Sequence, residues 1–415
     1  MVLRQPGPGQ SGRIGELLST TPIRRSVDQA TRSSARPRLL FDPLMLVATF
    51  GLVIVSVLAI GGSTRTDIPG APDFFAHRQI AYAVIGTVLM LVISRFDYSR
   101  LREFKIGIYG LMIALNILPL LLAAATRGAR SWIELPFFRF QPSELGKVLL
   151  IVALAGFIVD RTRRLGERET TARLMLLALG PAALVMVQPD LGSASVYVVT
   201  ALTMLFIAGS PGRHIAGLIG LFAVSLVLVL AVAPAVGVNV LKPYQVDRLT
   251  GFLSPNEDNN ETTYQLNQSK IAIGSGEKTG RGLDRATQTG LNFLPEHHTD
   301  FIFSVVGERW GFAGAGLVLS LFALLIWRTL RLLTMAKNLF GTLIAAGILA
   351  MLMYQLLVNV GMTIGIMPIT GVTLPLMSYG GASYLTTFIA LGLLQSIHIQ
   401  ARIAQGSKGR GLVLS

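Results

Sequence analysis

The sequence predicts an all-α polytopic membrane protein with about ten transmembrane helices and one long extracytoplasmic loop. Of its 415 residues, 52% are hydrophobic and only 14% are charged, whereas soluble proteins average about 25% charged residues. The mean hydropathy is +0.59. The chain contains no cysteine, which excludes disulfides, thiolate catalysis and cysteine-based metal sites.

Ten apolar segments are candidates for membrane spans, because a helix needs about 20 predominantly apolar residues to cross the hydrocarbon core. Gln188-Pro189-Asp190 interrupts the stretch 172–209, and proline cannot continue a helix cleanly. We expect two spans with a tight reversal there; one broken helix is the alternative. The ten segments are residues 44–62, 79–94, 106–125, 145–160, 172–187, 193–209, 213–236, 302–327, 341–363 and 376–398.

The two ends of the chain are polar. Residues 1–40 are rich in Arg, Ser and Pro, so we expect a disordered basic tail. No apolar run lies near Met1, so the first span, from Leu44, is expected to remain uncleaved. The transmembrane domain is expected over residues 41–400, with a C-terminal tail over residues 401–415.

The distribution of charge assigns the two faces of the membrane. Ten spans place both termini on one side, and basic residues mark the cytoplasmic side. With both termini cytoplasmic, the inner segments carry 23 of the 36 Lys and Arg residues but only 8 of the 22 Asp and Glu residues. The net charge of +14 therefore reflects topology and contact with anionic lipids, and no nucleic-acid partner is expected.

The long interior loop, about residues 237–301, lies on the outer face in this topology. Structureless loops of this length are uncommon and usually functional, so its chemistry is expected to face the periplasm or the cell exterior. Tyr264–Ile273 is expected to form an amphipathic helical stretch, followed by a glycine cluster over Gly274–Gly282. The glycines could bring backbone N–H groups close to a ligand; a glycine-rich turn with no ligand is the alternative.

Asp300 sits where the polar loop becomes an apolar span. A carboxylate at such a border is partly desolvated, which makes it a better general base. The alternative is structural: Thr299 or Asp300 would cap the helix expected to begin at Phe301.

A second outer loop carries a pair of opposite charges. Pro142 fits a helix start, and Glu144 and Lys147 are spaced i,i+3, so they can touch on one helix face. Charges within the membrane are costly and tend to face a cavity. A functional role for the pair and a purely structural ion pair are therefore equally good interpretations. Arg130 and Lys147 could meet a pyrophosphate.

Polar residues also occur in the remaining outer segments. Asp190 is expected to cap the next span or to line a polar cavity, and the cap is favoured. Gln355 and Asn359 are spaced i,i+4 and are expected to hydrogen-bond between helices. The Pro and Gly residues of Met367–Gly381 break helices, and such backbone is tolerated at membrane depth only where it packs on protein or lines a cavity.

Taken together, these segments resemble the SEDS family of polytopic cell-wall proteins, that of RodA, FtsW and SpoVE. The resemblance runs in family order over about residues 41–400, and Met367–Val372 is more similar to RodA than to FtsW. The matching motifs are Gly128–Trp132 with Gln141–Leu145, Gln188–Gly192, Tyr264-Gln265 through Gly276, Leu294–Glu296 with His298–Phe303, and Pro368–Gly371 through Gly381.

The resemblance implies a peptidoglycan glycosyltransferase that polymerises lipid II at the outer face of the cytoplasmic membrane, in cell-wall elongation and cell shape. The 4-hydroxyl of GlcNAc on one lipid II attacks the anomeric carbon of MurNAc on the growing strand, and undecaprenyl pyrophosphate leaves. The family's essential aspartate matches Asp300, which is expected to act as the base.

The resemblance also implies partners and further site residues. A class B penicillin-binding protein, which is a single-span transpeptidase, is the expected partner, alongside other elongation or division machinery. A divalent cation, Mg²⁺ or Mn²⁺, is implied, although the sequence shows no ligand cluster for one. Glu144 and Asp190 are expected to orient Lys147 or to bind a cation. The candidate substrate-binding residues are Arg130, Lys147, Glu144, Gln265, Ser269, Asp190 and Ser378.

Two other functions stay open at this point. A lipid II flippase or transporter would suit the polytopic architecture and the intramembrane charges equally well, but it gives Asp300 no obvious task and the two halves show no convincing repeat. A non-catalytic scaffold would make outer-face substitutions harmless.

Overall fold

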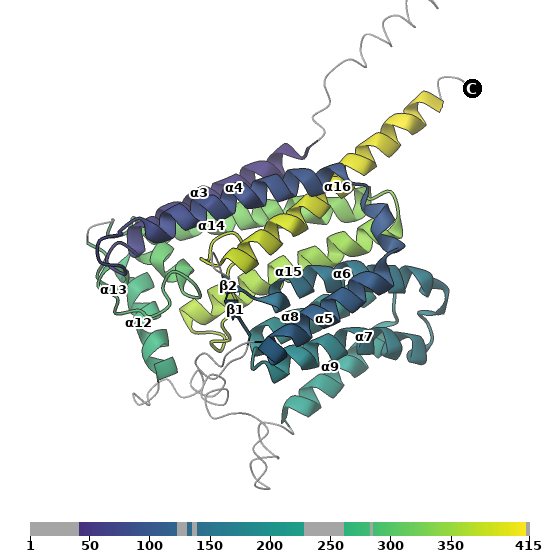
Figure 1. Cartoon of the computed structure of the whole chain (residues 1–415), viewed down its shortest axis with the longest axis horizontal. Coiled ribbons are helices and arrows are strands. Elements are labelled where there is room, and N and C mark those ends of the chain that lie inside the picture. The colour runs from purple at the N-terminus through teal and green to yellow at the C-terminus, as the bar shows by residue number, and fades with distance from the viewer. Residues whose placement is uncertain (1–40, 123–130, 135–138, 228–260, 283–284, 412–415) are drawn as a thin grey trace, which may run out of the picture. The chain divides into compact units, whose positions relative to one another are not determined.

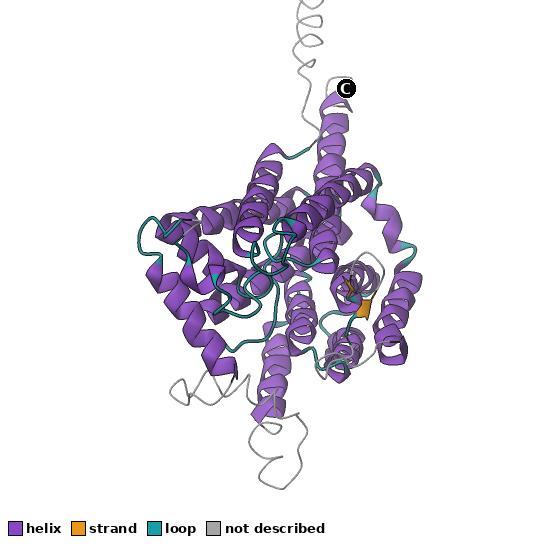
Figure 2. Ribbon diagram, turned by 60° about the vertical axis from the view of Figure 1, so that its left-hand side comes forward, coloured by secondary structure: helices purple, strands orange, loops and turns teal. Residues whose placement is uncertain are grey.

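The computed structural model describes residues 41–122, 131–134, 139–227, 261–282 and 285–411, and most of them are helical (Figure 2). Within these ranges, strands β1 (Ile133–Glu134) and β2 (Arg139–Phe140) form one short antiparallel pair. Two single turns of 3₁₀-helix, η1 (Tyr98–Arg102) and η2 (Thr162–Arg164), connect longer helices. The expected all-α fold class is confirmed.

Each of the ten expected spans contains a helix (Figure 1). Seven of these are long and apolar enough to cross a membrane, and α5 and α8 are shorter apolar helices. The ten helices are α3 (Pro43–Ser63), α4 (Phe74–Arg95), α5 (Lys105–Leu122), α6 (Pro142–Asp160), α7 (Arg168–Val187), α8 (Leu191–Ile207), α9 (Gly212–Val227), α14 (Ile302–Met335), α15 (Leu339–Ile364) and α16 (Gly381–Gly411).

The stretch 172–209 forms two helices, as expected. Helix α7 ends at Val187 and α8 begins at Leu191. The two helices pack against each other, so the interruption at Gln188–Asp190 is a reversal of the chain and the single broken helix is wrong.

The most deeply buried helices are α6, α15 and α16. Helix α15 packs on α6, α8 and α14, and α16 packs on α4 and α6. Small residues permit these close contacts: a Cβ added at Gly347 of α15 would lie 2.7 Å from Ile151 of α6. Such tight packing fixes the helix ends that carry the polar segments.

The expected amphipathic stretch is helix α12 (Glu261–Ser275), and it packs against α14 and α15. The short helix α13 (Thr287–Gly290) follows and contacts α3 and α14. Glu308 of α14 is fully buried, and its carboxylate accepts hydrogen bonds from the backbone N–H of Gln288, at 2.8 Å, and of Thr289, at 2.9 Å. A buried α14 carboxylate thus anchors the outer segment.

The glycine cluster after α12 lies along a kink in α14. Gly311 has φ of 61° inside the helix, so the turn around it loses regular helical hydrogen bonds. The cluster replaces them: the N–H of Arg281 donates to Glu308 O, at 2.9 Å, and that of Phe312 donates to Glu277 O, at 2.9 Å. Of the cluster's own N–H groups, that of Arg281 and that of Gly282, which donates to Arg309 O at 3.0 Å, are bonded to α14. These two groups fit the ligand-free alternative for the cluster and not the expected ligand cradle.

Gly280→Ala is expected to lower the free energy of unfolding by about 2–5 kcal/mol. A Cβ there would lie 2.1 Å from the backbone oxygen of Arg309, and overpacking of this kind costs about 1–3 kcal/mol. The positive φ of 85° adds roughly 1–2 kcal/mol for any L-side chain. Gly282→Ala is the matched control, because its φ is also positive but its Cβ would meet no described atom within 4 Å.

The measurement is the midpoint of thermal unfolding in detergent for both variants beside the wild type. A much lower midpoint for Gly280→Ala than for Gly282→Ala is expected. Equal midpoints would mean that the close backbone contact with α14 does not matter.

Candidate active site

Asp300 is half-buried and directly precedes Phe301, the N-cap residue of α14. Its backbone is fixed from α15: the buried Asn359 side chain donates from Nδ2 to Asp300 O and to Val372 O, both at 2.8 Å. Phe301 occupies the N-cap position of α14, and the Thr299 hydroxyl donates to Glu296 instead of accepting from the first turn of the helix. Asn359 was expected to hydrogen-bond between helices; it instead joins α15 to two non-helical segments, the one before α14 and the one before α16.

The segment before Asp300 lies against the irregular segment before α16. The backbone N–H of Tyr379 donates to His298 O, at 2.8 Å. The rings of His298, Phe75 and Tyr379 all contact one another, with the His298 centroid 4.9 Å from that of Phe75 and 5.6 Å from that of Tyr379. Ser56 of α3 donates to Met377 O, at 2.7 Å. The irregular backbone expected around residues 367–381 is therefore packed on protein on both sides.

Asp190 serves as a cap and as the centre of a polar cluster. Its Oδ1 accepts a hydrogen bond from the N–H of Ser193, at 2.9 Å, which makes it the N-cap of α8 as expected. Its Oδ2 accepts from Gln141 Nε2, at 2.7 Å, and from Ser143 Oγ, at 3.4 Å. Burial in the turn between α7 and α8 raises the pKa of the Asp190 carboxyl, and the nearby Glu144 carboxylate raises it further.

Glu144 and Lys147 form the i,i+3 ion pair that their spacing allows. Lys147 Nζ lies 2.7 Å from Glu144 Oε1, and the two side chains are only 3% and 6% exposed. Glu144 occupies the first turn of α6, where a negative charge is favoured by the helix dipole. The pair is thus a fully buried charge-assisted hydrogen bond next to the Asp190 cluster.

The Asp190 cluster and Asp300 adjoin the same irregular segment. A Cβ added at Gly192 would lie 2.6 Å from Thr370 O and 2.8 Å from a methyl group of Val372. The backbone carbonyls of Val372 and Asp300 both accept hydrogen bonds from the Asn359 side-chain amide. The backbone of residues 370–372 therefore connects the segment of Asp190, which caps α8, with the segment of Asp300, which precedes α14.

Two of the expected substrate-binding residues are enclosed by protein. Ser269 is fully buried, and its hydroxyl is 2.7 Å from Ser304 Oγ and from Thr363 O, so it ties α12 to α14 and α15. Ser378 is 3% exposed and accepts from Leu374 N–H, at 2.8 Å. Both hydroxyls are buried and bonded to other protein groups. In this structure they stabilise the site and are not exposed for direct contact with a substrate.

The other candidates lie in different places. Gln265 is on α12 and is half-buried. Arg130 lies outside the described residues, so its predicted contact with a pyrophosphate has no structural counterpart here.

One group of metal-ligating side chains was not predicted from the sequence. Asp67, from the loop between α3 and α4, lies beside His297 and His298 of the segment that leads to Asp300. The adjacent histidines were the only signal in the sequence, and nothing indicated which distant carboxylate would meet them.

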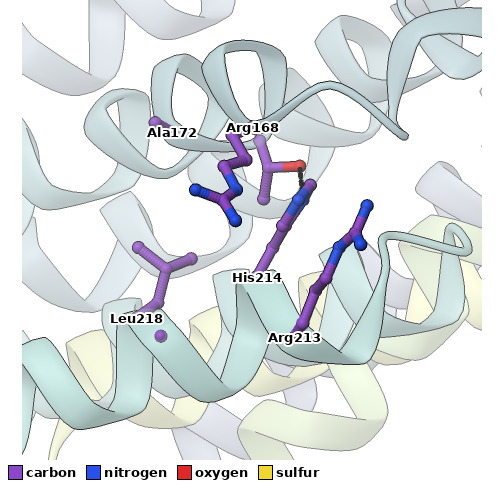
Figure 3. A pocket seen from close by; sticks show the side chains of 7 residues that line it. Arg168, Ala172, Arg213, His214 and Leu218 are labelled. Carbon is purple, nitrogen blue, oxygen red and sulfur yellow. Dashed lines mark hydrogen bonds between the residues drawn. The ribbon is translucent and has the colours of Figure 1, made fainter.

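A cavity of about 360 Å³ lies elsewhere. It is lined by Arg168, Thr171, Ala172, Arg213, His214, Gly217 and Leu218, from α7 and α9 (Figure 3). Arg168 begins α7, whereas Asp190 follows its other end, and 20 helical residues span about 30 Å. The cavity therefore does not belong to the site around Asp300.

Comparison with known proteins identifies the family. The family described as "Cell cycle protein" (FTSW_RODA_SPOVE) matches residues 37–403. The peptidoglycan glycosyltransferase RodA of Treponema pallidum is 35% identical, over 86% of this chain and 97% of that protein. The peptidoglycan glycosyltransferase MrdB of Escherichia coli K12 is 33% identical, over 92% of this chain and 99% of that protein.

A solved structure has the same fold. It is a chain of a peptidoglycan synthase complex that coordinates polymerization and crosslinking; the TM-score is 0.72 and the identity 32%, over 88% of this chain and 99% of that one. Sequence, fold and the ordered motifs agree, and the chain belongs to the FtsW, RodA and SpoVE family of multi-pass bacterial inner-membrane proteins.

Proposed function

We propose that this protein is a peptidoglycan glycosyltransferase that polymerises lipid II into glycan strands at the outer face of the cytoplasmic membrane, during cell-wall elongation. The activity is that named for its relatives RodA and MrdB. The single structural observation that carries the proposal is the fixed position of Asp300. It is half-buried at the start of α14 and held through Asn359 beside the segment that contacts the Asp190 cluster.

The chemistry needs one base. A sugar hydroxyl is a weak nucleophile, so a positioned carboxylate that accepts its proton in the transition state accelerates attack by about 10²–10⁴-fold. Asp300 would accept the proton of the GlcNAc 4-hydroxyl while the oxygen of that hydroxyl bonds to the anomeric carbon of MurNAc. The bond from that carbon to the pyrophosphate oxygen breaks, and the pyrophosphate leaves as an anion, so no general acid is required. This differs from the two carboxyl groups of most glycosidases.

Positive charge stabilises the departing pyrophosphate. Lys147 and Arg130 are the proposed sources. In the structure the Lys147 ammonium is paired with Glu144 inside protein, so the pair has to open toward the substrate for a direct contact.

The Mg²⁺ or Mn²⁺ ion implied by the resemblance does not fit the described carboxylates near Lys147. Hard cations need several free oxygen ligands. The Glu144 carboxylate is paired with Lys147, and both Asp190 oxygens accept hydrogen bonds from protein groups. No step is assigned to such an ion here.

The proposed partner is a class B penicillin-binding protein that cross-links the product strands. The solved relative is part of a complex that coordinates polymerization and crosslinking, which supports this pairing. We also propose that both termini are cytoplasmic, because the basic residues concentrate in the segments on their side of the membrane.

The function is tested with purified protein in liposomes that contain fluorescent lipid II. The expected result is a ladder of glycan strands on a gel that a muramidase digests, absent from a mock preparation of the same host. The reaction is run with and without the partner, and with Mg²⁺ or Mn²⁺. No ladder under any of these conditions, combined with movement of lipid II between leaflets, would replace the polymerase by the flippase alternative.

A further inference from the structure

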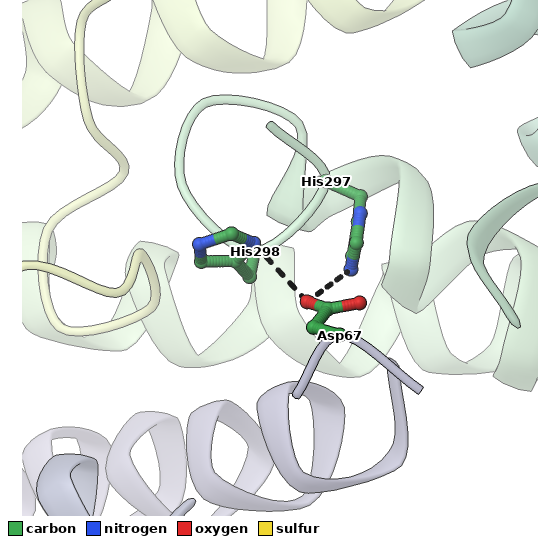
Figure 4. A group of neighbouring side chains, drawn as sticks. All are labelled: Asp67, His297 and His298. Carbon is green, nitrogen blue, oxygen red and sulfur yellow. Dashed lines mark ion pairs between the residues drawn. The ribbon is translucent and has the colours of Figure 1, made fainter. Parts of the chain in front are cut away.

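Three metal-ligating side chains meet beside the segment that leads to Asp300. Asp67 comes from the loop between α3 and α4, and His297 and His298 lie just before α14 (Figure 4). His297 Nε2 is 3.6 Å and His298 Nδ1 is 4.0 Å from the same oxygen, Asp67 Oδ2. The three side chains are 5–19% exposed, so the ligand atoms face one another in a mostly desolvated space.

The two ring nitrogens that face Asp67 have no hydrogen-bond partner among the described residues. His297 Nδ1 is 3.1 Å from Leu294 O, and a carbonyl only accepts, so Nδ1 carries the hydrogen. In the neutral ring Nε2 is then an acceptor, and it faces a carboxylate. Among the described residues, Asp67 Oδ1, His297 Nε2 and His298 Nδ1 have no hydrogen-bond partner. Buried acceptors gathered around one point are costly unless a cation joins them.

The imidazoles are held in the orientation that ligands need. A backbone carbonyl that accepts from the far ring nitrogen, as Leu294 O does for His297, is the arrangement typical of metal-ligating histidines. The His298 ring packs against those of Phe75 and Tyr379, which also contact each other.

We propose that Asp67, His297 and His298 bind a transition-metal ion of the Zn²⁺ class, which ties the loop between α3 and α4 to the segment that positions Asp300. Two imidazole nitrogens and one carboxylate oxygen suit Zn²⁺ and similar ions, whereas Mg²⁺ and Ca²⁺ prefer oxygen ligands. The fourth ligand position is left for water.

The spacing is close to what such an ion requires. Metal–ligand bonds of about 2.0–2.1 Å in a tetrahedral arrangement place ligand atoms roughly 3.3 Å apart. The observed atoms lie 3.6 and 4.0 Å from Asp67 Oδ2, and all within 4.8 Å of one another. Small side-chain rotations therefore close the site without a rearrangement of the helices.

The metal site stands independently of the proposed function, whereas its effect on Asp300 rests on it. His298 is two residues before Asp300, and its backbone carbonyl is already fixed by Tyr379. An ion bound to His298 would add a second fixed point from the side of α3. Its role is to position the segment; it does not touch the reacting atoms.

The test measures Zn²⁺ binding directly. Tag-free protein in detergent is treated with a chelator, dialysed, and titrated with Zn²⁺ in competition with a chromogenic chelator; bound zinc is counted by mass spectrometry. The expected result is one Zn²⁺ per chain for the wild type. Asp67→Asn and His297→Ala should weaken binding by at least about ten-fold, since even loss of a group that only orients a ligand costs about 10–100-fold.

His77→Ala is the matched control, because His77 is an exposed histidine of α4 outside the cluster; it should bind Zn²⁺ as the wild type does. Thermal unfolding in chelator checks that Asp67→Asn is folded, and added Zn²⁺ should raise the midpoint of the wild type but not of this variant. Less than half an equivalent of zinc in the wild type, or unchanged affinity in Asp67→Asn, overturns the proposal.

The polymerisation assay separates this inference from the proposed function. Zinc binding without any glycan ladder would contradict the polymerase and leave the metal site standing. A glycan ladder from protein that binds no zinc would support the polymerase and contradict the metal site.

Discussion

Asp300→Asn is expected to reduce the rate of lipid II polymerisation by about 10²–10⁴-fold, the contribution of a positioned general base. An asparagine amide has nearly the same shape as the carboxyl group but cannot take the proton of the attacking hydroxyl. The hydrogen bond from Asn359 goes to the backbone carbonyl of residue 300, which the substitution keeps. The fold should therefore survive while the chemistry fails.

The measurement is the initial rate of strand formation from fluorescent lipid II, together with the midpoint of thermal unfolding. Glu134→Gln is the control, because Glu134 is an acid of β1 whose side chain is 67% exposed and lies outside the cluster; it should polymerise at the wild-type rate. A folded Asp300→Asn protein that retains more than about one tenth of the wild-type rate would remove Asp300 from the role of base.

Lys147→Met is expected to destabilise the protein by about 3–5 kcal/mol, because it leaves the Glu144 carboxylate buried without its counter-charge. The double variant Glu144→Gln with Lys147→Met removes both charges and should recover much of that stability. We expect it to remain inactive, because the ammonium that would contact the pyrophosphate is still missing. Thermal unfolding and polymerisation are measured for the single and double variants together.

This pair of readouts separates the two interpretations of the ion pair. A double variant that regains both stability and activity would make the pair purely structural. Lys147→Arg keeps the charge but changes its shape, and it is expected to lose activity; full activity in that variant would contradict a specific Glu144–Lys147 geometry.

Local rules explain which site features were predictable from the sequence. An i,i+3 spacing on a helix that starts at Pro142 is enough to pair Glu144 with Lys147, because helix geometry alone brings them together. The cap formed by Asp190 is equally local, since it involves a backbone N–H three residues away. The placement of Asp300 at a border between loop and helix needed only the change in polarity along the chain.

The residues whose surroundings could not be predicted are those whose neighbours lie far away in sequence. Ser269 was expected to meet substrate, but helix packing turns its hydroxyl toward Ser304 and Thr363. The glycine cluster was open to a ligand by sequence alone, yet the kink at Gly311 exposes backbone groups of α14 that its amides satisfy. In both cases a buried polar group found a partner within the protein, as burial demands.

The membrane-spanning fold and the family were predictable from the sequence, because the length of apolar runs and the order of motifs are properties of local segments. Only the tertiary structure decided what surrounds Asp300. Asn359 holds its backbone, residues 370–372 link it to Asp190, and Asp67 reaches His297 and His298. These contacts join helices that are distant in the chain, and their geometry comes from close packing between helices, which no local pattern specifies.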